Sequence, residues 1–242
     1  MSVGIVFIFL ASNLSLFAKE YSVESPDGSI QVSVSVDKKI NWSAAVNGYA
    51  VFNENEISLD LGNEVLGLNS TIAGVEKAST DEIVHPIVPL KSASIRNSFN
   101  QLRLSFSSDF IICFRVFNNG FAYRFETLKS EEITVYDEAV LLNLTDNFPV
   151  LFPEEESLLS HYERLYVDEK VAMLGKGRFC SLPMLVKADN NIKIAITEAD
   201  LYDYPGLFLE TTGSNSLFSK FPHIILEHRD VRGPHDCYRK GS

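Results

Sequence analysis

Residues 109–128 read DFIICFRVFNNGFAYRFETL, and this stretch decides the fold class. Two runs rich in aromatic and β-branched residues flank an Asn-Asn-Gly segment at 118–120. Such runs favour β-strands, and an Asn-Gly step is typical of the tight turn of a β-hairpin. The stretch therefore predicts a hairpin. Its core residues are expected to include Phe114, Val116, Phe121, Tyr123 and Phe125.

The same strand pattern recurs on both sides of this hairpin. Residues 29–36 (SIQVSVSV) alternate strictly between apolar and polar side chains, as a half-buried strand does. A Pro-Asp-Gly turn at 26–28 precedes them, and an Asn-Gly pair at 47–48 joins the next two apolar runs. Only residues 153–161 are compatible with a turn or a short helix. Further strands are predicted around Leu102, Leu104 and Phe106 and at 133–136, 138–144, 182–186 and 192–197.

Together these segments amount to roughly a dozen short strands punctuated by turns, which is typical of an all-β domain. No alternation of strands and helices is present, so the sequence encodes neither a doubly wound α/β fold nor a (β/α)₈ barrel. We therefore predict one large antiparallel β-sandwich.

Composition narrows the function. The chain of 242 residues is 45% hydrophobic and 11% aromatic, which is ample for a packed core. Its formal net charge is −11, and no block of lysine and arginine interrupts the acidity. A polyanion would be repelled by such a surface, so nucleic acid is not an expected partner.

The first 18 residues have the pattern of a secretory signal peptide. Their apolar run, from Val3 to Ala11, is too short to span a bilayer, and the segment ends in the small residue Ala18. Cleavage near Ala18 would leave no membrane anchor. The sequence thus predicts a secreted protein, expected in a bacterial periplasm.

Several familiar chemistries are not encoded. The chain lacks Gly-x-Ser-x-Gly, a phosphate-binding loop, a dinucleotide fingerprint and His-Glu-x-x-His, and its five histidines are scattered. Cys113, Cys180 and Cys237 have no spacing that fits a disulfide framework or a thiolate metal site, and Cys113 is expected to be a small buried hydrophobe. The acidic run 154–156 is interpreted as a solvated turn.

One stretch does combine chemistry-bearing residues. Residues 194–210 (IAITEADLYDYPGLFLE) carry an alternating strand to a carboxylate, Glu198, and then to Asp200 and Asp203. Carboxylates at a strand end can bind Ca²⁺, which takes about 6–8 oxygen ligands, or can simply face solvent. The rings around Pro205 could bind a sugar or pack against a partner domain; these are Tyr202, Tyr204 and Phe208.

The order of several motifs resembles the N-terminal domain of glycoside hydrolase family 97, over roughly Glu20 to Phe221. The motifs are SPDGSIQVSVSV, IRNSFNQLRLSF, FRVFNNGFAYRF, SHYERLY and ITEADLYDYPGLFLE. The hairpin FRVFNNGFAYRF and the element EADLYDYPG are the most specific of them. This family contains α-glucosidases and α-galactosidases.

The resemblance implies a β-super-sandwich like that of galactose mutarotases, followed in family members by a catalytic (β/α)₈ barrel. It also implies a calcium ion held mainly by barrel glutamates, with one further glutamate from the N-terminal domain. By motif position that metal ligand is Glu198. The chain departs from the family at Gln101, where a glutamate is usual, and in the tail from His228.

The expected organisation is a signal peptide (1–18), the family domain (19–227) and an atypical tail (228–242), without the barrel. We expect a carbohydrate-associated domain of a secreted, calcium-dependent α-glycosidase, holding no catalytic residue and inactive alone. Calcium should bind weakly or not at all to this chain. Its partner would be an α-linked oligosaccharide or a (β/α)₈ catalytic barrel.

Three alternatives stay open. The domain could be a stand-alone carbohydrate-binding sandwich or a non-functional truncated fragment. A mutarotase-like enzyme would instead need a histidine, such as His161 or His223, facing a glutamate across a sugar cleft.

Overall fold

The computed structural model describes all residues except 1–18, 189–191, 200, 203 and 223–242. The predicted signal peptide and the atypical tail, together with Asp200, Asp203, His223 and Cys237, lie outside the described residues. The described part is almost entirely antiparallel β-structure, which confirms the predicted fold class. Its one helical element is a single 3₁₀ turn, η1 (Val171–Leu174).

A ten-stranded sheet runs through the whole domain in the order β1-β2-β3-β4-β10-β18-β17-β14-β12, with β5 paired to β4. Every pairing in it is antiparallel. Its strands are β1 (Lys19–Glu24), β2 (Ile30–Val36), β3 (Ile40–Val46), β4 (Tyr49–Asp60), β5 (Val65–Leu66), β10 (Asp137–Asn143), β12 (Glu154–Glu155), β14 (Lys176–Cys180), β17 (Phe208–Thr212) and β18 (Ser216–Lys220).

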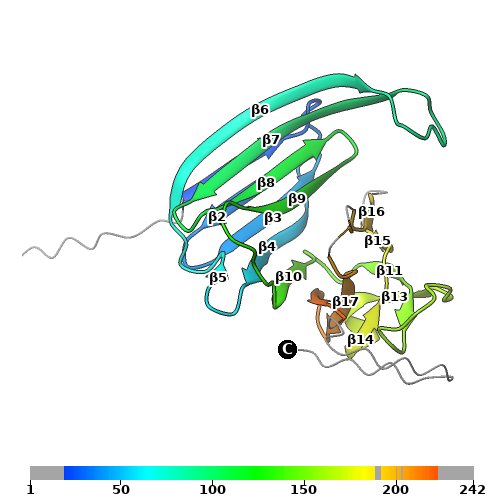
Figure 1. Cartoon of the computed structure of the whole chain (residues 1–242). Coiled ribbons are helices and arrows are strands. Elements are labelled where there is room, and N and C mark those ends of the chain that lie inside the picture. Colours follow the sequence, from blue (N-terminus) through cyan, green and yellow to red (C-terminus); the bar gives the residue numbers. More distant parts are fainter. Residues whose placement is uncertain (1–18, 189–191, 200, 203, 223–242) are drawn as a thin grey trace, which may run out of the picture.

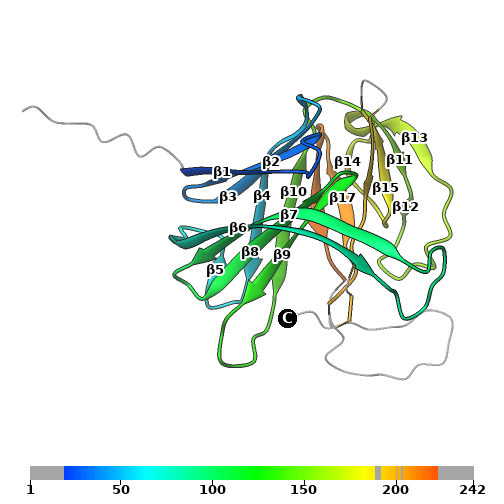
Figure 2. The ribbon, with the colours of Figure 1, turned by 90° about the horizontal axis from the view of Figure 1, so that it is seen from above.

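Two four-stranded sheets complete the structure. The first has the order β6-β7-β8-β9, and Figures 1 and 2 show it as a second layer over β1 to β4. The other has the order β13-β11-β15-β16 and lies beside the far end of the long sheet. The strands are β6 (Ile72–Val84), β7 (Ile95–Phe106), β8 (Phe110–Phe117), β9 (Gly120–Thr127), β11 (Pro149–Phe152), β13 (Val167–Lys170), β15 (Met184–Lys187) and β16 (Lys193–Ile196).

The core lies between the layers and follows the predicted alternation. The side chains of Ile30, Val32, Val34 and Val36 are buried along β2, while the residues between them are not. Leu102, Leu104 and Phe106 are buried along β7 in the same way. Burying these apolar side chains is the main favourable contribution to folding.

The hairpin that decides the fold is formed as predicted, with β8 and β9 paired from Phe110 to Thr127. Phe114 and Val116 are fully buried, and Phe121, Tyr123 and Phe125 are partly buried against the core. The expectation for Cys113 also holds, since its side chain is 2% exposed.

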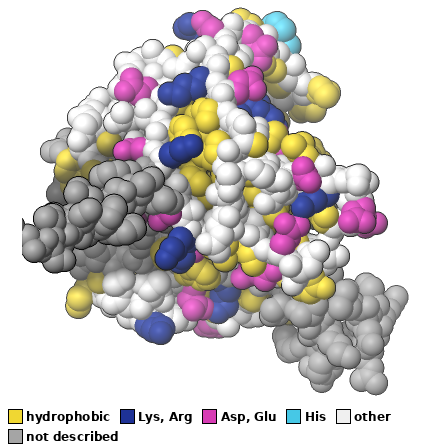
Figure 3. Space-filling view, turned by 90° about the vertical axis from the view of Figure 1, so that its left-hand side faces the viewer, with side chains coloured by type: hydrophobic (Ala, Val, Ile, Leu, Met, Phe, Trp, Pro, Cys, Tyr) yellow, Lys and Arg dark blue, Asp and Glu magenta, His cyan; other side chains and the backbone are white. Residues whose placement is uncertain are grey.

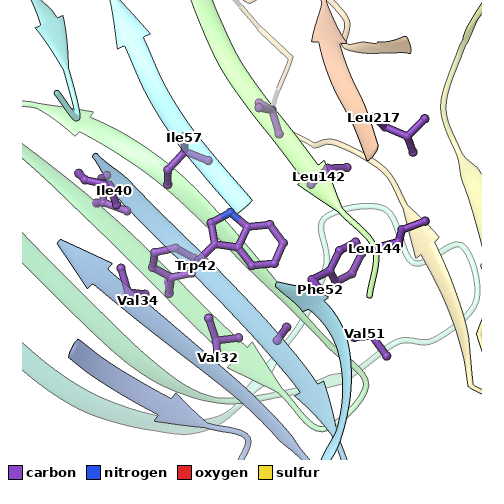
Figure 4. Packing of buried hydrophobic residues seen from close by; sticks show 14 of the residues in the cluster. Val32, Val34, Ile40, Trp42, Val51, Phe52, Ile57, Leu142, Leu144 and Leu217 are labelled. Atoms are coloured by element: carbon purple, nitrogen blue, oxygen red, sulfur yellow. The ribbon is translucent and has the colours of Figure 1, made fainter. Parts of the chain in front are cut away.

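Trp42 occupies the middle of this core, as Figure 4 shows. Its ring centroid lies 5.4 Å from that of Phe52 and 5.2 Å from that of Phe121, so the residue joins the two layers. Its indole nitrogen is buried without a hydrogen-bond partner among the described residues. Packing rather than hydrogen bonding therefore holds the indole.

Three local predictions were wrong. Residues 133–136 form no strand, because Ile133 and Val135 pack on the core without a ladder partner and pairing with β4 begins at Asp137. Residues 153–161 form no helix, since β12 instead pairs with β14.

The acidic run 154–156 is also not a solvated turn. Glu155 has a fully buried side chain, which accepts hydrogen bonds from Arg164 and Ser181. Glu154 is paired with Arg178, and only Glu156 faces solvent. Arginines distant in sequence provide the positive charge that allows this run to enter a sheet.

Candidate functional site

Glu198 lies at the rim of the sandwich, directly after β16. That strand pairs with β15 and keeps Ile194 and Ile196 against the core, so the chain leaves the sheet at a fixed point. The segment 197–207, named here the Glu198 loop, then returns to β17; residues 200 and 203 of it lie outside the described residues. The loop closes on its own carboxylate, because the backbone N–H of Leu207 donates to Glu198 Oε2 at 2.8 Å.

The second oxygen, Glu198 Oε1, accepts no hydrogen bond from any described residue. It lies beside Gly206. A Cβ atom placed on Gly206 would lie 3.4 Å from Glu198 Oε1 and 3.4 Å from the hydroxyl oxygen of Tyr162, so both oxygens are close to this glycine. Two of the motifs, SHYERLY and EADLYDYPG, therefore meet here.

Tyr162 holds its place through its ring and an unusual backbone. Its φ of 58° lies in the left-handed region, which non-glycine residues seldom adopt outside tight turns and functional sites. Its ring centroid is 5.8 Å from that of Phe208. Sequence reasoning gave this tyrosine no role, although its motif was one of those that carried the resemblance.

A second carboxylate, Glu138, is hydrogen-bonded to the same loop. It lies on β10, and both of its oxygens are bonded: Tyr204 donates to Oε2 at 2.8 Å and Tyr123 donates to Oε1 at 3.1 Å. Burial raises the pKa of the Glu138 carboxyl, although these two hydroxyl bonds act in the opposite direction. Glu138 was not predicted from the sequence, because nothing about an isolated glutamate on a strand reveals partners on β9 and before β17.

The electrostatics of the rim are unfavourable to anions. Burial raises the pKa of Glu198, and the nearby charge of Glu138 raises it further, while the Leu207 N–H opposes the shift. Burial, followed by the charges of Glu198 and Glu155, raises the pKa of Tyr162. No described cationic side chain pairs with Glu198 or Glu138 within ion-pair distance.

A single carboxylate, with one oxygen that no described residue donates to, fits one position in a calcium shell and no more. Within the part of the chain that the structure describes, no three His, Cys, Asp or Glu side chains converge as a metal-binding group. Calcium takes about 6–8 oxygens, so the described residues fit a contributory ligand rather than a complete site.

The three predicted aromatic residues lie in different environments. Tyr202 is 90% exposed and presents its ring to solvent. Tyr204 is partly buried, bonded to Glu138, with its ring edge-on to Phe221 at 5.9 Å. Phe208 is 1% exposed and packs between Tyr162 and Phe179, so it offers no face to a sugar or a partner domain in this arrangement.

Two groups of exposed apolar side chains are present among the described residues. The first, the loop patch, comprises Leu159, Tyr162, Leu165, Tyr166, Leu201 and Tyr202. The second, the hairpin tip, connects β6 to β7 and comprises Ile83, Val84, Ile87, Val88, Leu90 and Ile95. In Figures 1 and 2 the tip extends beyond the β6–β9 layer toward the half that holds β11 to β18. Exposed apolar patches of this kind mark interaction surfaces.

The remaining surface features lie elsewhere. Two shallow grooves of about 370 and 380 Å³ follow β1, β7 and the hairpin turns, and neither includes Glu198 or Tyr202.

On the face drawn in Figure 3, acidic and basic side chains are interspersed. His161 is exposed on its loop. Among the described residues, no helix has the length and apolar character needed to cross a membrane.

The ionisation of Glu138 should make stability depend on pH. The folded chain holds the proton of Glu138 more tightly than the unfolded chain does. The stability that this proton contributes is therefore complete below the ordinary pKa of 4.5, and it is lost as the pH rises through the raised pKa of the folded state. Glu154 acts in the opposite sense, since its hydrogen bond from Arg178 lowers its pKa and that stability is lost in acid. Thermal unfolding should therefore show a maximum near pH ~5. In Glu138→Gln the fall in Tm between that maximum and neutral pH should be smaller; an identical pH profile would contradict the assignment.

An antiparallel β-sandwich with a carboxylate-bearing loop at its rim is the class of domain that the structure defines. Comparison with known sequences identifies the family: residues 23–227 match the family described as Glycosyl-hydrolase 97 N-terminal. The chain belongs to this family, as the motifs suggested.

Individual relatives are consistent with this family assignment. The chain is 31% identical over 235 residues to a retaining alpha-galactosidase of Bacteroides thetaiotaomicron, covering 92% of this chain and 35% of that protein. A glycoside hydrolase family 97 enzyme of Pseudoalteromonas sp. strain K8, solved with acarbose, superposes with a TM-score of 0.73 at 17% identity, over 83% of this chain and 32% of the other. A beta-arabinopyranosidase superposes at 0.71 and 19% identity, over 82% and 35%. The chain thus spans about a third of the length of each relative, and the solved structures support the fold.

Proposed function

We propose that this chain acts as the N-terminal domain of a calcium-dependent α-glycosidase and supplies Glu198 as one ligand of the calcium ion. The observation that carries the proposal is Glu198 Oε1, which lies at the rim beside Gly206 and Tyr162 and has neither a hydrogen-bond donor nor a cationic partner among the described residues. A divalent cation at this oxygen would remove the unfavourable proximity of like charges. Calcium is favoured because hard cations prefer carboxylate oxygen.

The remaining ligands would come from the catalytic domain, so the ion would join the two domains. For the chain alone we expect a dissociation constant on the order of 10⁻³ M or weaker, the range of protein sites with few charged ligands. The substrate class proposed is an α-linked galactoside or glucoside, and the related protein named a retaining alpha-galactosidase supports the first. We further propose that the protein is exported with removal of residues 1–18.

The loop patch and the hairpin tip are proposed as the surface that docks on the catalytic domain. Leu165 and Ile87 are almost fully exposed, at 94% and 101%, which is unfavourable for a domain that stays in water. The loop patch includes residues of the Glu198 loop, and the hairpin tip extends toward the same half of the domain, where a neighbour contributing ligands would have to lie. Tyr202 belongs to this surface, so contact with the catalytic domain is its proposed role.

The test joins this domain to a catalytic domain of the family. In the Bacteroides relative, the matching N-terminal part would be replaced by residues 19–222 of this chain, and calcium affinity would be measured by titration calorimetry. Glu198→Gln should weaken calcium binding by about tenfold or more, because a neutral amide oxygen replaces a charged ligand. Galactosidase activity at limiting calcium should fall in parallel.

Glu156→Gln provides the matched control, since it removes the same charge from a carboxylate that is 86% exposed. It should leave calcium affinity unchanged. If Glu198→Gln binds calcium as tightly as the parent chimera, Glu198 is only a loop carboxylate and the metal role is wrong.

A further inference from the structure

One attachment of the Glu198 loop to the sandwich involves a carboxylate that the proposed calcium site does not use. Leu207 packs against the core, and its N–H bonds back to Glu198, which closes the loop on itself. Among the described residues of the loop, a side-chain hydrogen bond to the long sheet is made by Tyr204, whose hydroxyl donates to Glu138 Oε2 at 2.8 Å. Tyr204 also packs edge-on against Phe221, just beyond β18.

Glu138 is well placed to serve as a fixed anchor. Its backbone is paired with Leu59 of β4 in the interior of the long sheet. Ser219 of β18 bridges the other side, donating to the carbonyl of Glu138 and accepting from the N–H of Val140. The second oxygen of the carboxylate accepts from Tyr123 of β9 at 3.1 Å. One side chain thus ties together the long sheet, the β6–β9 layer and the Glu198 loop.

The arrangement is favourable for a carboxylate. Both oxygens accept a hydroxyl hydrogen bond, and bonds to a charged acceptor are stronger than neutral ones. A glutamine would offer one neutral acceptor and one NH₂ donor, so one of the two tyrosine hydroxyls would have to accept a hydrogen bond instead of donating it. Keeping a partly buried carboxylate without a cationic partner is costly, so its retention calls for a compensating role.

We propose that Glu138 is the positioning residue for Glu198: through Tyr204 it fixes the Glu198 loop on the sheet, so that Glu198 Oε1 keeps its place beside Gly206 and Tyr162. This proposal rests on the proposed function for its calcium consequence, whereas the clamp itself is a property of the chain alone. Tyr123 shares the carboxylate but lies on β9, outside the loop, so its bond steadies Glu138 without holding the loop directly.

That difference supplies the experiment. Tyr204→Phe and Tyr123→Phe each delete one hydroxyl bond to the same carboxylate, with almost no change in packing volume. Amide hydrogen exchange would be measured on the full chain, comparing the Leu207 amide with amides of β8. Tyr204→Phe should speed exchange at Leu207 by about tenfold or more, the size expected for losing a bond to a charged acceptor, while β8 keeps its protection.

Tyr123→Phe should leave the exchange rate of the Leu207 amide within about threefold of the parent, since the deleted bond joins Glu138 to β9 and leaves the bond between Glu138 and Tyr204 intact. Equal exchange at Leu207 in the two variants, or an increase spread evenly over β8, would overturn the proposal in favour of general destabilisation.

A terbium titration separates this inference from the calcium role. Tb³⁺ is a calcium substitute, and the phenol ring of Tyr162, whose hydroxyl lies beside Gly206 with Glu198, is placed to sensitise its emission. Tyr204→Phe should weaken Tb³⁺ binding by about threefold or more through loss of positioning. If Glu198→Gln left the sensitised emission of the chain unchanged, the calcium role would fail, and the exchange comparison would still decide the clamp.

Discussion

Replacing Phe114 with alanine should lower the free energy of unfolding by about 3–5 kcal/mol, the usual cost of deleting a buried aromatic ring. Phe114 is fully buried at the centre of β8, the strand between β7 and β9. Its ring centroid lies 5.8 Å from that of Tyr123, so the substitution also removes an aromatic contact across the hairpin. Domains of this kind are stable by about 5–15 kcal/mol in total, so the variant should be close to unfolding at 37 °C.

Urea denaturation followed by circular dichroism would measure the change. Leu128→Ala is the control, because Leu128 follows the same hairpin and is 57% exposed; its cost should stay within about 0.5 kcal/mol. A cost below about 1 kcal/mol for Phe114→Ala would mean that the hairpin does not organise the core.

Much of the fold could be predicted because it depends on local patterns. Strict alternation at 30–36 sets which face of β2 is buried, and the Asn47-Gly48 turn, with φ of 51° and 77°, fixes where β3 reverses into β4. The β8–β9 hairpin also forms, but it reverses at Asn118-Asn119, and Gly120 is the first residue of β9. The prediction failed where a segment's conformation depends on distant partners. Residues 133–136 alternate like a strand but find no ladder, and 154–156 read as polar although Arg164 and Arg178 neutralise the run.

At the candidate site, too, the residues set by local patterns could be predicted, and those set by distant partners could not. Glu198 could be nominated because it ends a strand inside a family motif, and its metal role stays a prediction. Glu138 could not, since its partners Tyr123 and Tyr204 lie 15 and 66 positions away and only the fold brings them together. Aromatic residues in the loop were recognised from composition, but composition does not distinguish the exposed ring of Tyr202 from the buried ring of Phe208.

The pair Arg164–Glu155 should have the second large effect on stability. The side chain of Glu155 is fully buried, with Arg164 Nε 3.2 Å from Oε2 and the hydroxyl of Ser181 3.1 Å from Oε1. In Arg164→Met the carboxylate would keep only the serine bond. Removing one partner from a buried ion pair costs about 3–5 kcal/mol, and we expect about 3 kcal/mol because the arginine is partly exposed.

The loss of stability in Arg164→Met should be reversed when the unpaired charge of Glu155 is removed as well. In the double variant Glu155→Gln with Arg164→Met, the neutral amide can still accept from Ser181, so most of the lost stability should return. Glu156→Gln, at the exposed neighbour, should change stability little. If the double variant were as unstable as Arg164→Met alone, packing of the arginine stem rather than charge would be the cause.

This pair also bears on the rim, because Arg164 belongs to the segment that carries Tyr162. With the arginine gone, residues 160–166 lose their ion pair to β12, while the ring of Tyr162 keeps its contact with Phe208. The Glu198 loop has a separate attachment through Glu138. Hydrogen exchange at Leu207 in Arg164→Met should therefore rise no more than the global loss of stability requires. A larger, local rise would show that the two loops are held as one unit.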